Sequence, residues 1–306
     1  MAFIEVKNVS KSYEGHQALK DLSFTIEKGS IYGLLGPNGS GKTTFIRILN
    51  RIITFDSGEI FFNGSLLKQE HVEKIGYLPE ERGLYKKMKV AEQVIYFAQL
   101  KGLTYTEALH RTKKLLKKFD MLSWWNKKLE ELSKGMQQKV QFLITIIHDP
   151  DLLIFDEPFS GFDPVNQEML KHEILELNRQ GKTILFSTHM MAAVEEVCDS
   201  ILLINNGEKI LEGKINDIKQ KFKQNKFKII FKNKETKFLS SNSFIVEKKA
   251  NGEYLVQIVD GSSSHQLLNY VLEFGDIVLF QELLPSLNEV FINVVKNSNT
   301  KVLKNE

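Results

Sequence analysis

The chain has 306 residues, of which 42% are hydrophobic and 26% charged, and its formal net charge is +3. This length suits one large domain and one small domain, and the charge is too weak to indicate an acidic partner by itself. No stretch approaches the ~20 continuous apolar residues needed to span a bilayer, so another polypeptide must supply any membrane part. The single cysteine, Cys198, cannot form an internal disulfide, which suits a reducing cytosol.

Hydrophobic patterning predicts strands and helices that alternate through most of the chain. In the first segments, apolar and polar residues partly alternate, as in strands. From Met88 to Ile147 the apolar residues recur at helical spacing. Continuous apolar runs elsewhere indicate strands that are buried on both faces. Asn206-Gly207 marks a hairpin turn. Strands are expected at 3–13, within 18–36, at 58–64, 151–158 and 182–188, and in the hairpin 200–213; helices are expected at 42–50, 91–100, 106–122, 168–181 and 191–199.

The composition changes near Asn216. Eight lysines and one acid, Glu235, lie from Lys219 to Lys237, and such a run is more often a solvated strand face and linker than a nucleic-acid or lipid site. Beyond it we expect a hairpin turn at Asn251-Gly252 and a mixture of strands and helices. The chain is therefore expected to divide into an α/β domain at 1–215 and a small α+β domain at 216–306. In the small domain, strands are expected at 227–233, 244–259 and 276–284, and helices at 264–274 and 286–295.

Residues 36–43 fit the pattern G-x-x-x-x-G-K-[ST], between an expected strand and an expected helix. A glycine-rich turn lets consecutive backbone N–H groups face inward and form an anion nest, and the following helix adds the positive end of its dipole. In this pattern Lys42 reaches the outer phosphates of a nucleotide and the Thr43 hydroxyl holds Mg²⁺. The context of strand and helix disfavours a glycine-rich turn without a ligand.

Two acids, Asp156 and Glu157, follow the buried run 152–155 and should emerge at the carboxyl edge of the sheet. Paired acids after a strand are otherwise often a solvated turn. Adjacent residues at a strand end point to different sides, so one acid can hold metal-bound water while the other faces the attacking water as base. His189 follows the next buried strand, where a neutral imidazole can donate near the γ-phosphate. The histidines without such context are expected to be structural: His16, His71, His110, His148, His172 and His265.

The segment "ELSKGMQQKV", residues 131–140, precedes these acids. Ser133 is a good N-cap, and apolar residues from Val140 onward form a core-facing stripe, so taken alone the segment is an ordinary capped helix. Its spacing from the acids is that of ABC-type ATPases, and it resembles their signature motif, leucine-serine-glycine-glycine-glutamine. Six motifs in the family's order extend the resemblance from Phe3 to about Gly213.

The resemblance implies an α/β fold: a P-loop NTPase core of ABC type with an antiparallel β subdomain and a helical signature subdomain at about 84–147. It implies ATP and Mg²⁺ as ligands, and a head-to-tail dimer in which each ATP lies between the Walker A loop of one copy and the signature helix of the other. Tyr13 resembles the aromatic residue that stacks on adenine, Glu80 lies at the position of the Q-loop glutamine, and Asp163 resembles the D-loop aspartate.

The resemblance thus implies four groups of site residues. They are, for the nucleotide, Tyr13, Gly36, Pro37, Asn38, Gly39, Ser40, Gly41, Lys42, Thr43 and Thr44; for catalysis, Glu157, His189 and Glu80; for the metal, Thr43, Asp156 and Glu80; and for the signature acting in trans, Ser133, Lys134, Gly135 and Met136.

Three positions depart from the family's pattern. Glu80 replaces glutamine, and a carboxylate there can still bind Mg²⁺ or water but repels phosphate, so hydrolysis and coupling are expected to be tuned differently. Lys134 replaces the first signature glycine, and its charge either aids ATP binding across the dimer or points to solvent. Met136 replaces the signature glutamine.

A narrower resemblance, carried by "YLPEERGLY", "LSKGMQQK" and "PSLNEVFINVV", is to the bacterial NatA/YhaQ-like exporter ATPases, whose C-terminal domain is of uncharacterised type. It implies an ATPase subunit, a homodimer or heterodimer, on the cytoplasmic face of the membrane. That subunit would power sodium, drug or peptide export through a separate permease. Residues 81–100 lie where ABC family members receive the coupling helix of the permease, so Arg82, Leu84 and Tyr85 are candidate contacts; the alternative is ordinary surface of the helical subdomain. The alternative function is that of a soluble ABC ATPase acting on the ribosome or on nucleic acid. The sequence disfavours this alternative, because translation-type members carry two ATPase cassettes where this chain has one, and repair-type members have long coiled coils that this sequence lacks. No nucleic-acid partner is expected.

Overall fold

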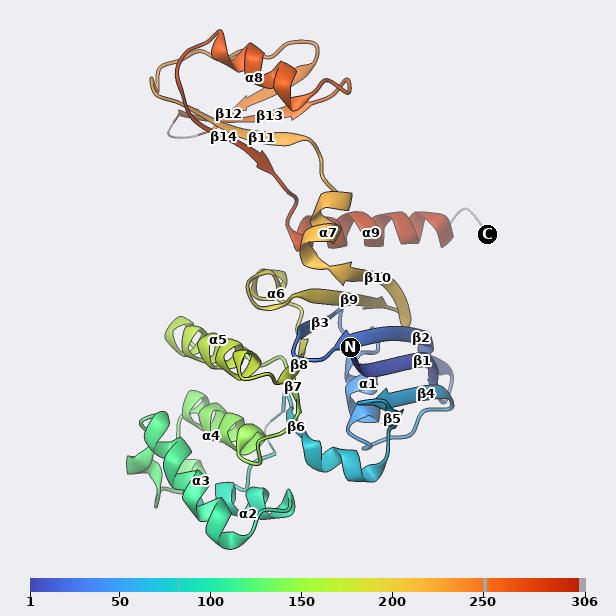
Figure 1. Ribbon diagram of the computed structural model, residues 1–306, viewed down its shortest axis with the longest axis vertical. Helices are drawn as coiled ribbons and strands as arrows, with labels where there is room; N and C mark the ends of the chain where they lie inside the picture. Colours follow the sequence, from blue (N-terminus) through green and yellow to red (C-terminus); the bar gives the residue numbers. More distant parts are fainter. Residues whose placement is uncertain (82, 250–251, 303–306) are drawn as a thin grey trace. The chain divides into compact units, whose positions relative to one another are not determined.

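The computed structural model describes residues 1–81, 83–249 and 252–302. The chain divides into two compact units, Met1–Lys214 and Ile215–Glu306. Figure 1 traces both units, coloured along the sequence.

The first unit is built on a six-stranded sheet with the order β10-β9-β3-β8-β7-β6. All its neighbouring strands are parallel except β10, which pairs antiparallel to β9. Every residue of β3, β7 and β8 is buried, which explains their solid apolar sequences. The strands are β3 (Ile31–Leu35), β6 (Ile75–Leu78), β7 (Leu152–Asp156), β8 (Thr183–Ser187), β9 (Ser200–Asn205) and β10 (Glu208–Lys214).

A second, antiparallel sheet has the order β2-β1-β4-β5. Helix α1 (Lys42–Leu49) buries one apolar face, including Phe45 and Ile46, in a core that it shares with residues of both sheets. The helix is thereby held between the sheets, and the loop that enters it is held as well. The strands are β1 (Ala2–Tyr13), β2 (His16–Glu27), β4 (Ser57–Phe62) and β5 (Ser65–Leu66).

A helical subdomain lies between β6 and β7 in the sequence. Its helices are α2 (Val90–Leu100), α3 (Tyr105–Lys118) and α4 (Lys134–Ile146), and Thr104 and Ser133 cap the last two with side-chain oxygens. Val94, Leu116 and Leu143 are fully buried in its core. Further helices are α5 (Pro164–Arg179) and α6 (Met191–Val197), with 3-10 turns at Gln69–Lys74, Leu122–Trp124 and Leu129–Glu131.

The second unit has its own antiparallel sheet with the order β12-β13-β11-β14. Alternate residues of β11 and β13 are buried, and they pack with Leu267 and Val271 of α8 in a separate core that is rich in aromatic rings. The elements are α7 (Ile215–Lys221), β11 (Lys226–Phe231), β12 (Phe244–Lys248), β13 (Glu253–Ile258), α8 (Ser264–Leu272), β14 (Ile277–Leu283) and α9 (Leu287–Val302).

The predicted fold class is confirmed: an α/β core with an antiparallel sheet and a helical subdomain is followed by an α+β unit. The hairpin at Asn206-Gly207 joins β9 to β10 as predicted. In the predicted turn at Asn251-Gly252, Asn251 lies outside the described residues, and so does Arg82. No described helix has the length and apolar character required to cross a membrane.

The core of the second unit gives a stability prediction. Ile229 on β11 is fully buried, whereas Ile245 on β12 is 54% exposed. We expect Ile229→Ala to cost the second unit about 3 kcal/mol of unfolding free energy because it leaves a cavity, and Ile245→Ala to cost less than about 1 kcal/mol. Amide hydrogen exchange along β11 and β13 of the full chain measures both. Equal losses of protection in the two variants would contradict this core.

Candidate nucleotide-binding site

The glycine-rich loop runs from the end of β3 to the start of α1, and two of its glycines are required by close packing. A Cβ atom on Gly36 would lie 2.2 Å from the carbonyl oxygen of Ile204, and one on Gly41 would lie 2.6 Å from that of Ala18. Both glycines also have positive φ angles, 150° and 112°. The loop is therefore pressed against β9 and β2, and no larger residue fits at either position.

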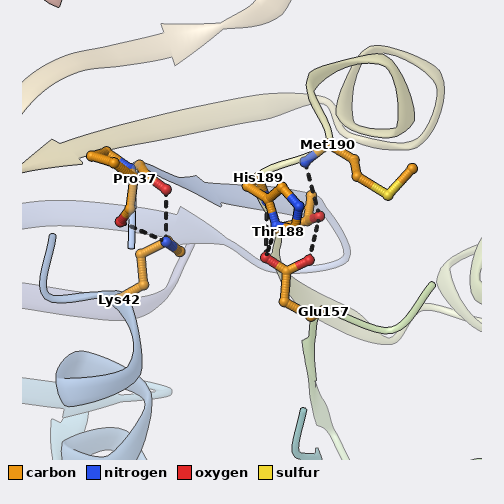
Figure 2. A network of polar contacts seen from close by, with 7 residues as sticks. Pro37, Lys42, Glu157, Thr188, His189 and Met190 are labelled. Carbon is orange, nitrogen blue, oxygen red and sulfur yellow. Dashed lines mark hydrogen bonds and ion pairs between the residues drawn. The ribbon is translucent and has the colours of Figure 1, made fainter. Parts of the chain in front are cut away.

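Lys42 is the first residue of α1 and is only 7% exposed. Its Nζ donates to the carbonyl oxygens of Gly36 (2.7 Å) and Pro37 (3.1 Å), so the side chain folds back along its own loop, as Figure 2 shows. Burial lowers the pKa of Lys42, and three neighbouring carboxylates oppose that effect. These are Glu157, Asp156 and Glu80.

A cavity of about 450 Å³ opens beside this loop. It gathers the loop, the acids after β7 and the histidine after β8 around one space. Its lining residues are Tyr13, His16, Ala18, Asn38, Gly39, Ser40, Gly41, Lys42, Thr43, Thr44, Glu80, Asp156, Glu157 and His189.

The two acids differ in backbone conformation and in surroundings. Asp156 ends β7 and is 3% exposed, and burial raises its pKa. Glu157 follows in the left-handed region with φ of 49°, which is rare for a residue with a side chain. Its backbone N–H donates to the carbonyl oxygen of Ser187 on β8 (2.8 Å). The chain therefore turns sharply at Glu157 and stays attached to the neighbouring strand.

The Glu157 carboxylate is held by the segment after β8 (Figure 2). Its Oε1 accepts from the backbone N–H of His189 (2.9 Å) and lies 2.7 Å from the ring Nδ1 of the same residue. Its Oε2 accepts from the Thr188 hydroxyl (2.9 Å), whose oxygen accepts in turn from the Met190 N–H (3.1 Å). His189 thus contacts Glu157 directly at the cavity wall.

Most of the site residues expected from the sequence line this one cavity, although Gly36 and Pro37 instead supply carbonyls to Lys42. His16, which was expected to be structural, lines the cavity together with Ala18. The feature that could have placed His16 at the cavity is the tight β1–β2 hairpin, in which His16 pairs with Tyr13. Thr188 was also missed, since a buried threonine gives no distinct pattern in a sequence.

The expected signature and D-loop residues lie outside the cavity lining and begin two helices. Ser133 is the N-cap of α4, and its hydroxyl accepts from the Met136 N–H (3.3 Å). Asp163 is the N-cap of α5, and its Oδ1 accepts from the N–H groups of Val165 and Asn166, each at 3.0 Å. Each side chain therefore makes hydrogen bonds to the first turn of the helix that it caps.

The donor set at the cavity is suited to a phosphate and its metal. Ser40 Oγ is buried and has no hydrogen-bond partner among the described residues, and the loop directs Lys42 and Thr43 to the same space. Within the described ranges, no cluster of three or more His, Cys, Asp or Glu side chains could hold a metal. Mg²⁺ is commonly bound by one or two protein groups together with phosphates and water, so Thr43 and Asp156 are a sufficient protein contribution.

Comparison with known proteins identifies both units. Residues 19–160 match the family described as "ABC transporter", and residues 213–295 match "ATP-binding protein DrrA1-3-like, C-terminal domain". The uncharacterized ABC transporter ATP-binding protein YhaQ of Bacillus subtilis is 39% identical over 293 residues, which cover 95% of this chain and 98% of YhaQ. The chain belongs to the ABC transporter ATP-binding proteins. The resemblance to the NatA/YhaQ-like branch is thereby confirmed.

Two further relatives of this ABC transporter ATP-binding protein are also from Bacillus subtilis. The ABC transporter ATP-binding protein NatA is 38% identical, with coverage of 73% of this chain and 93% of NatA. The linearmycin resistance ATP-binding protein LnrL is 34% identical, with coverage of 70% of each chain. ABC ATP-binding proteins hydrolyse ATP, and the prediction that this chain is an ATPase is confirmed at the level of the family.

A solved structure shows how such ABC cassettes assemble. The dimeric structure of a bacterial ABC transporter cassette has a TM-score of 0.64 and 26% identity, and covers 69% of this chain and 98% of its own. Cassettes of this family form dimers and work with membrane permease subunits.

The steric role of Gly36 can be tested against Gly39. A Cβ on Gly39 would meet no heavy atom within 4 Å, although its φ is also positive, at 79°. We expect Gly39→Ala to cost about 1 kcal/mol of unfolding free energy from backbone strain alone, and Gly36→Ala to cost about 2–4 kcal/mol because it adds a clash. Denaturant unfolding of the nucleotide-free full chain measures the difference. Equal costs would show that the loop can move away from Ile204.

Proposed function

We propose that this ABC ATP-binding protein powers export of sodium, a drug or a peptide through a separate membrane subunit. The 450 Å³ cavity supports the ATP-hydrolysing part of the proposal, because it joins the glycine-rich loop to Glu157 and His189. The name of LnrL, a linearmycin resistance protein, supports the drug type, and the narrower branch resemblance supports export in general.

For the nucleotide, we assign adenine stacking to Tyr13, which is 46% exposed and lines the cavity. The loop at 36–44 would surround the phosphates with backbone N–H groups, and Lys42 Nζ would exchange its two carbonyl partners for phosphate oxygens. The buried, unpartnered hydroxyl of Ser40 supports this assignment, because a phosphate oxygen supplies the partner that the described residues do not.

For the metal, we assign Thr43 and Asp156 as the residues that hold Mg²⁺, with Glu80 beside them at the cavity wall. Bound Mg²⁺ neutralises phosphate charge and orients the γ-phosphate. Burial and the neighbouring carboxylates of Glu157 and Glu80 raise the pKa of Asp156, and a bound Mg²⁺ would offset this and favour the ionised form.

For hydrolysis, we assign Glu157 as the base that takes a proton from the attacking water, and His189 as the residue that orients Glu157 and the γ-phosphate. The 2.7 Å contact between His189 Nδ1 and Glu157 Oε1 supports this pairing. Glu80 contributes a third carboxylate, which is expected to tune the reaction where the family has an uncharged glutamine.

For the signature segment, we assign residues 133–136 to the ATP of a partner cassette, in a homodimer or a heterodimer. A Cβ at Gly135 would meet only the Phe162 ring, at 3.9 Å, among the described atoms, so packing within this chain does not require glycine there. Close approach by a partner's nucleotide supplies a reason for it. Asp163 would lie at the same dimer interface.

For the permease, we assign the largely apolar cavity of about 400 Å³ beside α2 and α4 as its docking surface. Leu84, Phe97, Leu100 and Ile144 line this cavity, and Tyr85 is 55% exposed. Such a hollow suits an amphipathic helix from a partner. The protein would then be cytoplasmic and peripheral on the inner face of the membrane.

The assignment of Glu157 gives a kinetic prediction. We expect Glu157→Gln to lower kcat for ATP hydrolysis by about 10²-fold or more, since an amide cannot accept the proton, while ATP affinity changes little. Steady-state turnover and a nucleotide titration measure the two quantities. Normal turnover would remove Glu157 from the role of base.

The transporter assignment is tested by capture of the partner. Tagged Glu157→Gln protein with ATP-Mg²⁺ is expected to hold a dimer and to bring down a stoichiometric multi-span protein from gently solubilised membranes. Lys42→Ala, which should not bind ATP, is the matched control. Recovery of ribosomes or nucleic acid in place of a membrane protein would overturn the transporter reading in favour of a soluble ABC ATPase.

A further inference from the structure

Thr188 is the most deeply buried polar side chain in contact with Glu157. It is 1% exposed, Glu157 is 9% exposed, and the His189 side chain is 64% exposed. Thr188 is not among the residues that line the nucleotide cavity. Its hydroxyl nevertheless reaches one carboxylate oxygen of the proposed base.

The direction of this hydrogen bond follows from the neighbouring groups. Thr188 Oγ1 accepts from the Met190 N–H at 3.1 Å, and an ionised carboxylate can only accept. The single hydroxyl hydrogen must therefore be directed to Glu157 Oε2, at 2.9 Å. The chain of donors runs from Met190 through Thr188 to Glu157 and has only one possible polarity (Figure 2).

The two carboxylate oxygens are held in different ways. Oε1 faces the exposed His189 ring, which can rotate towards a bound nucleotide because solvent surrounds most of it. Oε2 faces the buried Thr188 hydroxyl, which has no room to leave. A carboxylate that lost the ring contact would still be fixed by the Thr188 hydroxyl and the His189 backbone N–H.

We propose that Thr188 is a positioning residue that fixes the Glu157 carboxylate for water activation. This inference rests on the proposed role of Glu157 as base. Without the hydroxyl, the carboxylate can rotate about its side-chain bonds, and a displacement of about 1 Å from productive geometry costs on the order of 10²-fold in rate. We expect nucleotide binding to be retained, because the loop and Tyr13 line the cavity and Thr188 does not.

The test uses Thr188→Val, which keeps the shape and removes the hydroxyl, and Thr188→Ser, which keeps the hydroxyl. In the full chain, we expect Thr188→Val to lower kcat by about 10–100-fold with the Kd for MgADP within about twofold of the wild type. Thr188→Ser should recover kcat to within about threefold of the wild type, because its hydroxyl can make the same bond. Turnover and calorimetric titration with MgADP are the readouts.

Thr112→Val is the matched control, because Thr112 is fully buried in α3 and its hydroxyl donates to the Ala108 carbonyl, remote from the site. It should leave kcat unchanged, which separates the loss of a buried hydroxyl in general from the loss of this one. A Thr188→Val protein with kcat within twofold of the wild type, or a Thr188→Ser protein as slow as Thr188→Val, would overturn the inference.

Glu157→Gln, assayed in parallel, keeps the two hypotheses apart. If Glu157→Gln turns over normally, the role of Glu157 as base fails and the inference about Thr188 fails with it. If Glu157→Gln is inactive and Thr188→Val is normal, only the role of Thr188 is overturned. A Thr188→Val protein that loses MgADP affinity in proportion to kcat would assign Thr188 to the stability of the site rather than to positioning of the base.

Discussion

The register of three neighbouring parallel strands is the constraint on which the candidate site depends. Leu34 of β3 and Asp156 of β7 both pair with Ser187 of β8. The glycine-rich loop, the acids and the Thr188-His189 segment therefore leave the sheet at the same level. A shift of one residue in either ladder would turn alternate side chains to the opposite face and separate the acids from the loop. Close packing of the side chains on both faces of these three buried strands opposes such a shift.

The helical subdomain is attached to this sheet edge by side chains and close packing rather than by a ladder. Gln138 of α4 donates to the Ser160 carbonyl, in the segment that leads to Asp163, and Gln141 donates to the Glu81 carbonyl (3.4 Å), directly after Glu80. The helix that begins at Ser133 is thus bonded to backbone on both sides of the nucleotide cavity. Helix α4 also packs closely on β6, because a Cβ on Gly76 would lie 2.3 Å from the Thr145 carbonyl oxygen, so packing and hydrogen bonds together attach the subdomain to the sheet.

Much of this organisation was predictable from the sequence because its signals are local. The glycine-rich loop before Lys42 and the apolar run that ends at Asp156 are each recognisable from a few consecutive residues. Each of them predicted one wall of the cavity. His16 and Thr188 were missed because their importance arises from pairing and from burial, which bring together residues far apart in the sequence. The bonds that join Glu157 to the segment after β8 likewise depend on strand order.

The two carbonyl contacts of Lys42 have a consequence for ligand selectivity. An anion bound by Lys42 as proposed would use the third N–H of its ammonium group or replace the Gly36 and Pro37 oxygens, so its binding energy would be a difference between two sets of partners. A single phosphate group would make only part of the contacts that the loop offers. A polyphosphate chain would make more of them, to the backbone N–H groups, the Ser40 hydroxyl and Lys42 together. If Lys42 binds the nucleotide as proposed, its folded-back side chain would favour a triphosphate over inorganic phosphate at this loop.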